Sequence, residues 1–306
     1  MIILHHYPES LFSEKIRLLL GYHDLDWRSV QISNVMPRPD LMPLTGGYRK
    51  TPVLQIDANV YCDTRIIARA LARISGDESL YAPGFPATRT AEWADTVLFQ
   101  ITVTMNFRPE AAAALFGRLS AEQVAAFQKD RAELSGGRAI VALPVSAASA
   151  ALREALVELD ANLARSEFLF GAAPCIADFS VYHCLWFLNN NPMNTSIIRP
   201  HASVARWMAR MAAFGHGRST PMTTAEALAH GRSCAPVLPD LETVSVADVA
   251  PGDAVNVMPV DYGRIPVSGR LQAMTPHEIV ILRDDPVAGE IMVHFPTPGF
   301  EISRAE

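Results

Sequence analysis

The segment Thr51–Thr64 reads TPVLQIDANVYCDT, and it decides the fold that we predict for this chain. An apolar run follows Pro52, and the turn residues Asp57-Ala58-Asn59 separate it from a second strand-forming pair, which is typical of a short β-hairpin. Directly after the hairpin, Asp63-Thr64 precedes RIIARALARI, whose apolar residues follow helical spacing. The segment therefore predicts a proline at the entrance of a strand and a helix that begins at an Asp-Thr pair.

These features could bind the charged end of an amino acid or a small peptide. The first turn of a helix has free N–H groups for a carboxylate, and a nearby Asp can bind an ammonium group. Pro52 lacks a backbone donor and is the residue type for which a cis peptide bond costs little. Each feature also has a simpler interpretation, because Asp63 or Thr64 can be an ordinary N-cap and Pro52 an ordinary trans proline. Both interpretations stay open at this point.

Composition excludes several classes of protein. The chain has 306 residues, 49% of them hydrophobic, and a net charge of −6 without a basic block, which argues against binding of nucleic acid or an anionic membrane. The N-terminus has no secretory leader, and the most apolar later stretch, 179–188, is far shorter than the ~20 residues that span a bilayer. Four scattered cysteines indicate a reducing compartment. We expect a cytoplasmic protein.

Residues 1–80 predict a thioredoxin-like α/β domain. The pattern gives a strand at 2–6, a helix at 13–22, a strand at 27–32, an irregular segment or broken helix at 36–50, and then the hairpin and its helix. A β-α-β unit followed by β-β-α, with a proline entering the third strand, is the thioredoxin-like arrangement of a sheet covered by helices.

Residues 87–229 predict an all-helical domain. Helical spacing indicates helices at 87–107, 120–134, 149–166, 176–190, 201–214 and, shorter, 219–229. The 176–190 segment is apolar almost all round and should be the buried centre of this domain. Trp93, Phe99 and Phe107 could line a ligand site, although packing in the core is the simpler interpretation.

Residues 240–306 predict a small all-β module. Nine of the 22 prolines lie between Pro236 and Pro298, which excludes long helices there. Short runs rich in Val and Ile at 254–258, 267–273, 278–282 and 290–295 are separated by turn residues. About five short strands in this length favour a small barrel or sandwich.

Few chemical motifs are present. The chain lacks Gly-x-Gly-x-x-Gly, a P-loop, His-Glu-x-x-His and Gly-x-Ser-x-Gly, so nucleotide, zinc-protease and hydrolase interpretations have no support. His5 and His6 are adjacent in a predicted strand and should point to opposite faces, and His183 lies on the buried helix. We predict no metal site.

One segment at the start of the first predicted helix contains hydroxyl groups that could take part in catalysis. In YPESLFSEKIR, residues 7–17, a hydroxyl lies between the end of a strand and the start of a helix. A hydroxyl there could donate a hydrogen bond to a thiolate, which the field of the helix N-terminus also stabilises. Ser10 could equally be a plain N-cap and Tyr7 a packed aromatic residue.

Together, three segments resemble a cytosolic glutathione transferase over about residues 1–228. They are YPESLFSEKIRLLL, then KTPVLQIDANVYCDTRIIARAL, which is similar to the family's cis-proline hairpin and acidic-hydroxyl pair, and FLFGAAPCIADFSVY, which resembles its capping-box segment. The resemblance implies a thioredoxin-like domain, an all-helical domain and glutathione as cosubstrate. The β-rich module at 240–306 lies outside the family's common body.

The resemblance also implies roles for single residues. Thr51, before Pro52, would pair its backbone with the cysteinyl unit of glutathione, and Asp63 and Thr64 would hold the γ-glutamyl ammonium and carboxylate. Lys50 would neutralise the glycyl carboxylate. Ser10 matches the position of the active serine or cysteine in the serine- and cysteine-type classes. It would stabilise the thiolate of glutathione and so lower the pKa of that thiol from ~8.5.

Three departures from the family pattern matter. Ser10 replaces the cysteine of the thiol-exchange classes, which argues against deglutathionylation. Tyr7 could be the active hydroxyl instead, as in tyrosine-type classes. Cys175 stands where Ser or Thr normally accepts from the third helical amide, so we predict a cap weaker by about 1 kcal/mol.

The predicted function is addition of the glutathione thiolate to a small electrophile, as in detoxification, by a cytoplasmic homodimer without a further cofactor. Two alternatives stay open: a non-catalytic glutathione-binding or regulatory protein, and a glutathione-dependent isomerase or dehalogenase. For the C-terminal module, packing onto the helical domain, covering the electrophile site, extending a dimer and binding a partner all stay open.

Overall fold

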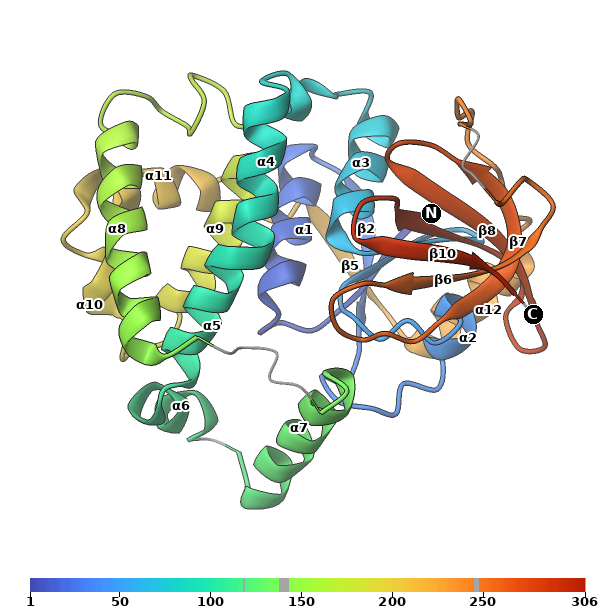
Figure 1. Cartoon of the computed structure of the whole chain (residues 1–306), viewed down its shortest axis with the longest axis horizontal. Coiled ribbons are helices and arrows are strands. Elements are labelled where there is room, and N and C mark those ends of the chain that lie inside the picture. The colour runs from blue at the N-terminus through green and yellow to red at the C-terminus, as the bar shows by residue number, and fades with distance from the viewer. Residues whose placement is uncertain (118, 138–142, 245–247, 306) are drawn as a thin grey trace.

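A computed structural model describes residues 1–117, 119–137, 143–244 and 248–305. One ten-stranded sheet runs through the part shown on the right of Figure 1, in the order β10-β6-β7-β8-β9-β4-β3-β1-β2-β5. The strands are β1 Ile2–His6, β2 Asp26–Gln31, β3 Val53–Ile56, β4 Asn59–Cys62, β5 Arg218–Met222, β6 Ala254–Pro259, β7 Val267–Met274, β8 Glu278–Asp285, β9 Gly289–Pro296 and β10 Phe300–Arg304.

The N-terminal part has the predicted thioredoxin-like arrangement. Strand β1 pairs with β2 in parallel and with β3 antiparallel, and β3 and β4 form the predicted hairpin across Asp57-Ala58. Asp57 has φ 54°, which the primed turns of short hairpins require and which Asp tolerates. The helices here are α1 Leu11–Tyr22, α2 Met42–Thr45 and α3 Thr64–Ser75, and the short α2 fits the predicted broken helix.

The all-helical domain, on the left of Figure 1, follows a 3₁₀ turn at Ser79–Tyr81. The predicted 87–107 helix is split by a π-helical turn at Ala94–Leu98, and two helices that the sequence did not predict, α6 and α10, are added. No helix among the described residues is both long enough and apolar enough to cross a membrane. The helices are α4 Phe85–Trp93, α5 Phe99–Phe107, α6 Pro109–Phe116, α7 Ala121–Leu134, α8 Val145–Leu163, α9 Ile176–Asn189, α10 Thr195–Ile198 and α11 Ala202–Ala212.

The two faces of the sheet are covered differently. On one face, α1 and α3 share a continuous apolar core with the helical domain, from Leu4 through Ile16 to Leu185 of α9, the predicted buried centre. On the other face, α2, the later helix α12 (Thr224–Ser233) and the strands of the C-terminal module (β6–β10) enclose a second core, which includes Val60 and Phe295. Burial of apolar area on both faces therefore holds the three parts of the chain together.

The C-terminal module contains five strands, as predicted, but it is not a separate barrel or sandwich. Its strand β9 pairs in parallel with β4, so the module continues the thioredoxin-like sheet. The expectation of a self-contained module came from the short strands alone. It missed that β4 is otherwise an edge strand, with unpaired N–H and C=O groups that another strand can bind.

A buried polar network secures this junction. His294 of β9 lies 2.6 Å from Glu278 of β8 and 2.9 Å from Asn59 of β4, and its ring stacks on Tyr61. Arg73 of α3 reaches the same carboxylate at 3.1 Å. Because each of these polar groups has a partner, the network aligns the module on the sheet without leaving a buried polar group unsatisfied.

The prediction of a helix at 219–229 was partly wrong. Residues Arg218–Met222 form strand β5, which pairs in parallel with β2, and only then does α12 begin. Thr223 and Glu226 make a capping box at that point, and Pro221 is tolerated because β5 is an edge strand. The unpaired edge of β2 therefore overrides the weak helical pattern.

Candidate functional site

A cavity of about 960 Å³ lies where the thioredoxin-like domain, the helical domain and the C-terminal module meet. All seven residues predicted for the site line it: Tyr7, Ser10, Lys50, Thr51, Pro52, Asp63 and Thr64. Residues from three separate segments of the N-terminal domain are thus brought to one place. The volume falls within the usual range for small-molecule sites.

Ser10 is the N-cap of α1. Its Oγ accepts a hydrogen bond from the Ser13 amide at 3.1 Å, so the simple structural interpretation is correct. A hydroxyl that accepts one bond keeps its own proton to donate. Among the described residues no side chain or carbonyl takes that proton from Ser10, so capping and donation to a ligand in the cavity are compatible.

Arg17 fixes the turn that carries Tyr7 and Ser10. Its guanidinium donates to the carbonyl oxygens of Tyr7 and Pro8, at 3.3 and 3.0 Å, and pairs with Glu14 at 2.7 Å. A planar guanidinium that makes several such bonds sets the direction of the backbone. Both candidate hydroxyls are therefore held on a rigid turn, and the contacts do not decide between them.

Asp63 caps α3 and carries an electrostatic cost. Its carboxylate accepts from the Arg65 amide at 2.9 Å, and its φ of 94° is a conformation that side chains other than glycine rarely adopt. Burial raises the pKa of Asp63, with nearby Lys50 opposing the shift. Within the described residues Asp63 forms no ion pair, so an ammonium group in the cavity would supply the missing counter-charge.

The Thr51–Pro52 peptide is cis, and a residue that sequence reasoning missed holds it in place. Buried Arg38 donates to the Thr51 hydroxyl and to the Arg49 carbonyl, both at 2.9 Å, and to the Ser33 carbonyl at 2.8 Å. Arg38 lines the cavity and puts a positive charge beside Thr51. The irregular composition of 36–50 gave no signal that could single it out.

Lys50 lies at the cavity, as predicted, but it already has partners. Its ammonium group is 2.5 Å from the Asp261 carboxylate and lies over the Tyr262 ring, 4.1 Å from the centroid. Both partners come from the loop between β6 and β7 of the C-terminal module. The module therefore contributes residues to the cavity wall.

The helical domain supplies an aromatic wall. Phe107, Phe116 and Phe127, from α5, α6 and α7, lie with ring centroids 5.5 to 6.2 Å apart and line the cavity. Phe99 also lines it, whereas Trp93 packs against the core. Two of the three aromatic residues singled out on this helix thus face the ligand space, where offset rings can bind an apolar group.

A buried ionic cluster borders the cavity as well. Lys15 of α1 is almost fully buried and lies 2.7 Å from Asp95, which also accepts from His183 at 3.0 Å. Asp95 belongs to the π-helical turn and lines the cavity. Residues 80 or more positions apart form this cluster, so no local pattern could predict it.

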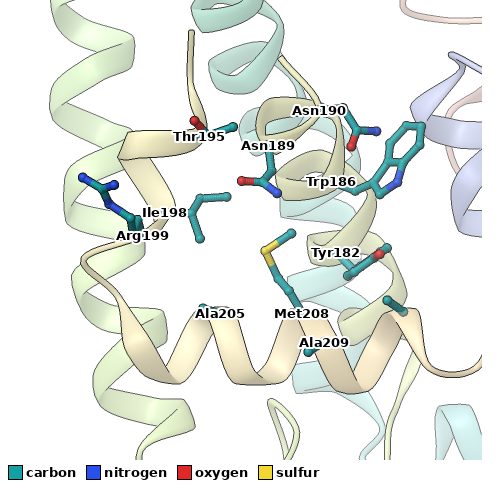
Figure 2. A pocket seen from close by; sticks show the side chains of 11 residues that line it. Tyr182, Trp186, Asn189, Asn190, Thr195, Ile198, Arg199, Ala205, Met208 and Ala209 are labelled. Atoms are coloured by element: carbon teal, nitrogen blue, oxygen red, sulfur yellow. The ribbon is translucent and has the colours of Figure 1, made fainter. Parts of the chain in front are cut away.

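Two other places do not use the predicted residues. A second cavity, of about 500 Å³, lies between α9, α10 and α11. Figure 2 shows its lining side chains, among them Trp186, Asn190 and Met208. A cluster of Asp57, His230 and Cys234 has side chains of metal-binding type, but its His–Asp contact of 2.8 Å is an ordinary hydrogen bond. Neither lies in the cavity wall described above.

Comparisons with known proteins agree with this geometry. Residues 4–79 match the family model "Glutathione S-transferase, N-terminal domain", and residues 144–210 match "Glutathione S-transferase, C-terminal domain". A search among curated proteins gave no match.

Among solved structures, a GST-like protein from Pseudomonas syringae is 37% identical, with 99% of each chain covered and a TM-score of 0.83. A glutathione S-transferase from Rhodospirillum rubrum F11 is 18% identical over 70% of this chain and 88% of its own, with a TM-score of 0.53. A mutant of poplar glutathione transferase F1 is 13% identical over 76% and 99%, with a TM-score of 0.51. The two more distant structures share the fold alone.

Proposed function

Because this chain belongs to the glutathione S-transferase family, we propose that it binds glutathione and adds the thiolate of glutathione to a small electrophile. The observation that carries this proposal is the joint placement of Ser10, the cis Thr51–Pro52 peptide and Asp63 in one cavity. The hydroxyl of Ser10 complements the thiol, and the backbone at Thr51 complements the cysteinyl unit. The carboxylate of Asp63, which has no ion pair among the described residues, complements the γ-glutamyl ammonium.

In this proposal the N-terminal domain activates the thiol. The hydroxyl of Ser10 donates to the thiolate, and the N-terminal field of α1 favours the same negative charge. Both effects lower the thiol pKa, so more nucleophile is present at neutral pH. The sulfur lone pair then forms a bond to the electrophilic carbon, and a leaving group departs with its electron pair or an added proton completes the product.

The aromatic wall holds the electrophile in this scheme. Phe107, Phe116 and Phe127 offer apolar contact opposite the polar residues, so an apolar electrophile can lie beside the sulfur. Glutathione is thus a cosubstrate, and the proposal uses no other cofactor. A homodimer in the cytoplasm and a role in detoxification remain predictions that accompany it.

The experiment is a conjugation assay with a chromogenic electrophile and glutathione, on wild type, Ser10→Ala and Tyr7→Phe. If Ser10 stabilises the thiolate, Ser10→Ala lowers kcat/KM by about 10² while Tyr7→Phe stays within about twofold. The reverse pattern would mean that the hydroxyl of Tyr7, and not that of Ser10, stabilises the thiolate. No conjugation by wild type, with glutathione still bound, would favour the non-catalytic alternative, or an isomerase or dehalogenase that needs a particular substrate.

A further inference from the structure

The contact between Lys50 and the C-terminal module bears on which thiol the site prefers. Asp261 is the only carboxylate within ion-pair distance of the Lys50 ammonium among the described residues, and the ring of Tyr262 covers a second side of it. The lysine side chain is only 13% exposed, whereas that of Asp261 is 54% exposed at the cavity rim. The positive charge of Lys50 is therefore already neutralised by the protein itself, whereas Arg38 on the other side of Thr51 has no carboxylate partner among the described residues.

The loop that carries Asp261 is anchored where it stands. Gly263 donates its amide to the carbonyl of Leu134 at the end of α7, 2.8 Å away, and has φ 67°. A side chain there would meet Leu134 at 3.1 Å and Lys50 at 3.5 Å. Arg264 ties the loop to Glu301 of β10 at 3.3 Å. These contacts fix the loop against both Lys50 and the helical domain.

We propose that Asp261 takes the place of the ligand's terminal carboxylate on Lys50, so that the site favours γ-glutamyl thiols whose terminal carboxylate is masked as an ester or amide. This inference rests on the proposed function, because it needs the thiol peptide to lie along Thr51 with its last residue at Lys50. A free carboxylate arriving there meets the Asp261 carboxylate as well as the lysine. A neutral ester or amide meets no such repulsion.

The size of the effect follows from exposure. Asp261 is half in solvent, so water and salt screen its charge and a ligand carboxylate can displace it. Removing the charge should therefore strengthen binding of free glutathione about three- to fivefold rather than by orders of magnitude. Binding of the masked thiol should stay the same, because that ligand brings no carboxylate to Lys50.

The test compares two ligands on matched variants of the full chain. Calorimetry measures Kd for glutathione and for its glycyl monoethyl ester on wild type, Asp261→Asn and Asp284→Asn. Asp284 is an exposed carboxylate of β8 outside the cavity wall, so its variant removes the same charge from the same module. We expect Asp261→Asn alone to tighten glutathione, with the ester unchanged within about twofold.

A further variant separates charge from loop distortion. In Lys50→Gln the two carboxylates no longer compete for an ammonium group and only their direct repulsion remains, so adding Asp261→Asn should change the glutathione Kd by less than it does in wild type. Binding of both ligands with equal Kd in wild type and Asp261→Asn would overturn this inference and leave the proposed function intact. Failure of every variant to bind either ligand would overturn both.

Discussion

The cavity has two main walls, and they differ both in chemistry and in what supports them. The polar wall, from the thioredoxin-like domain, carries Ser10, Thr51 and Asp63. Helix caps, the cis Thr51–Pro52 peptide and arginine hydrogen bonds hold these residues. The helical wall, which is the aromatic wall supplied by the helical domain, carries phenylalanines that lie in contact with one another. Directional contacts suit a ligand that is always the same, whereas aromatic surfaces suit ligands of varying shape.

The first prediction concerns the support of the polar wall. Burial lowers the pKa of His5 to about 4 and that of His6 to about 3, with Arg17 adding to the effect on His6. In the unfolded chain both have a pKa of about 6.5. Between pH 6.5 and 4 the unfolded state therefore binds more protons, so the free energy of unfolding should fall by about 3 kcal/mol or more as pH drops.

Denaturant unfolding at several pH values measures this slope. His5→Gln can keep a hydrogen bond to Gln55 while it removes one titrating group, so its slope should be shallower than that of wild type. Equal slopes would mean that His5 does not contribute to the loss of stability in acid.

The second prediction concerns the helical wall. Truncation of Phe127 to alanine removes apolar contact with the electrophile, so its KM should rise about fivefold while the KM for glutathione stays within about twofold. Phe85→Ala is the control, because Phe85 is exposed and lies outside the cavity wall. A large change in the KM for glutathione in Phe127→Ala would break the division between the two walls.

The third and smallest effect concerns a helix start outside both walls. Cys175 caps α9, and its thiol donates to Asp178 at 3.3 Å, while Asp178 also accepts from the Cys175 amide at 2.9 Å. The Cys175 sulfur also lies where it can accept from the Asp178 amide, but a hydroxyl oxygen is the stronger acceptor, so Cys175→Ser should raise the free energy of unfolding by about 1 kcal/mol. Thermal unfolding beside Cys234→Ser measures it, and no gain over that control would refute the weak-cap hypothesis.

Much of the polar wall could be predicted because its signals are local. The hairpin, the Asp63 cap and the Ser10 turn each lie within a few residues, where backbone propensity decides the structure. The family resemblance then put them in one site. Propensity could not place Arg38, since nothing about its neighbours distinguishes it from a surface arginine.

The remaining features depend on contacts between distant parts of the chain. The Lys50–Asp261 pair spans 211 residues, and the β4–β9 pairing depends on which strand reaches a free edge. Strand patterns gave the number of strands in the C-terminal module but not their neighbour, so a separate barrel or sandwich was expected. The strand β5 was missed for the same reason.

Calorimetric titration of wild type and Asp63→Ala with glutathione measures whether Asp63 and its neighbours bind this ligand. Asp77→Ala, at the opposite end of α3, is the control. We expect saturable binding to wild type and the control with Kd between about 10 μM and 1 mM, and loss of binding in Asp63→Ala. No binding to wild type at millimolar glutathione, or equal binding to Asp63→Ala, would contradict this expectation.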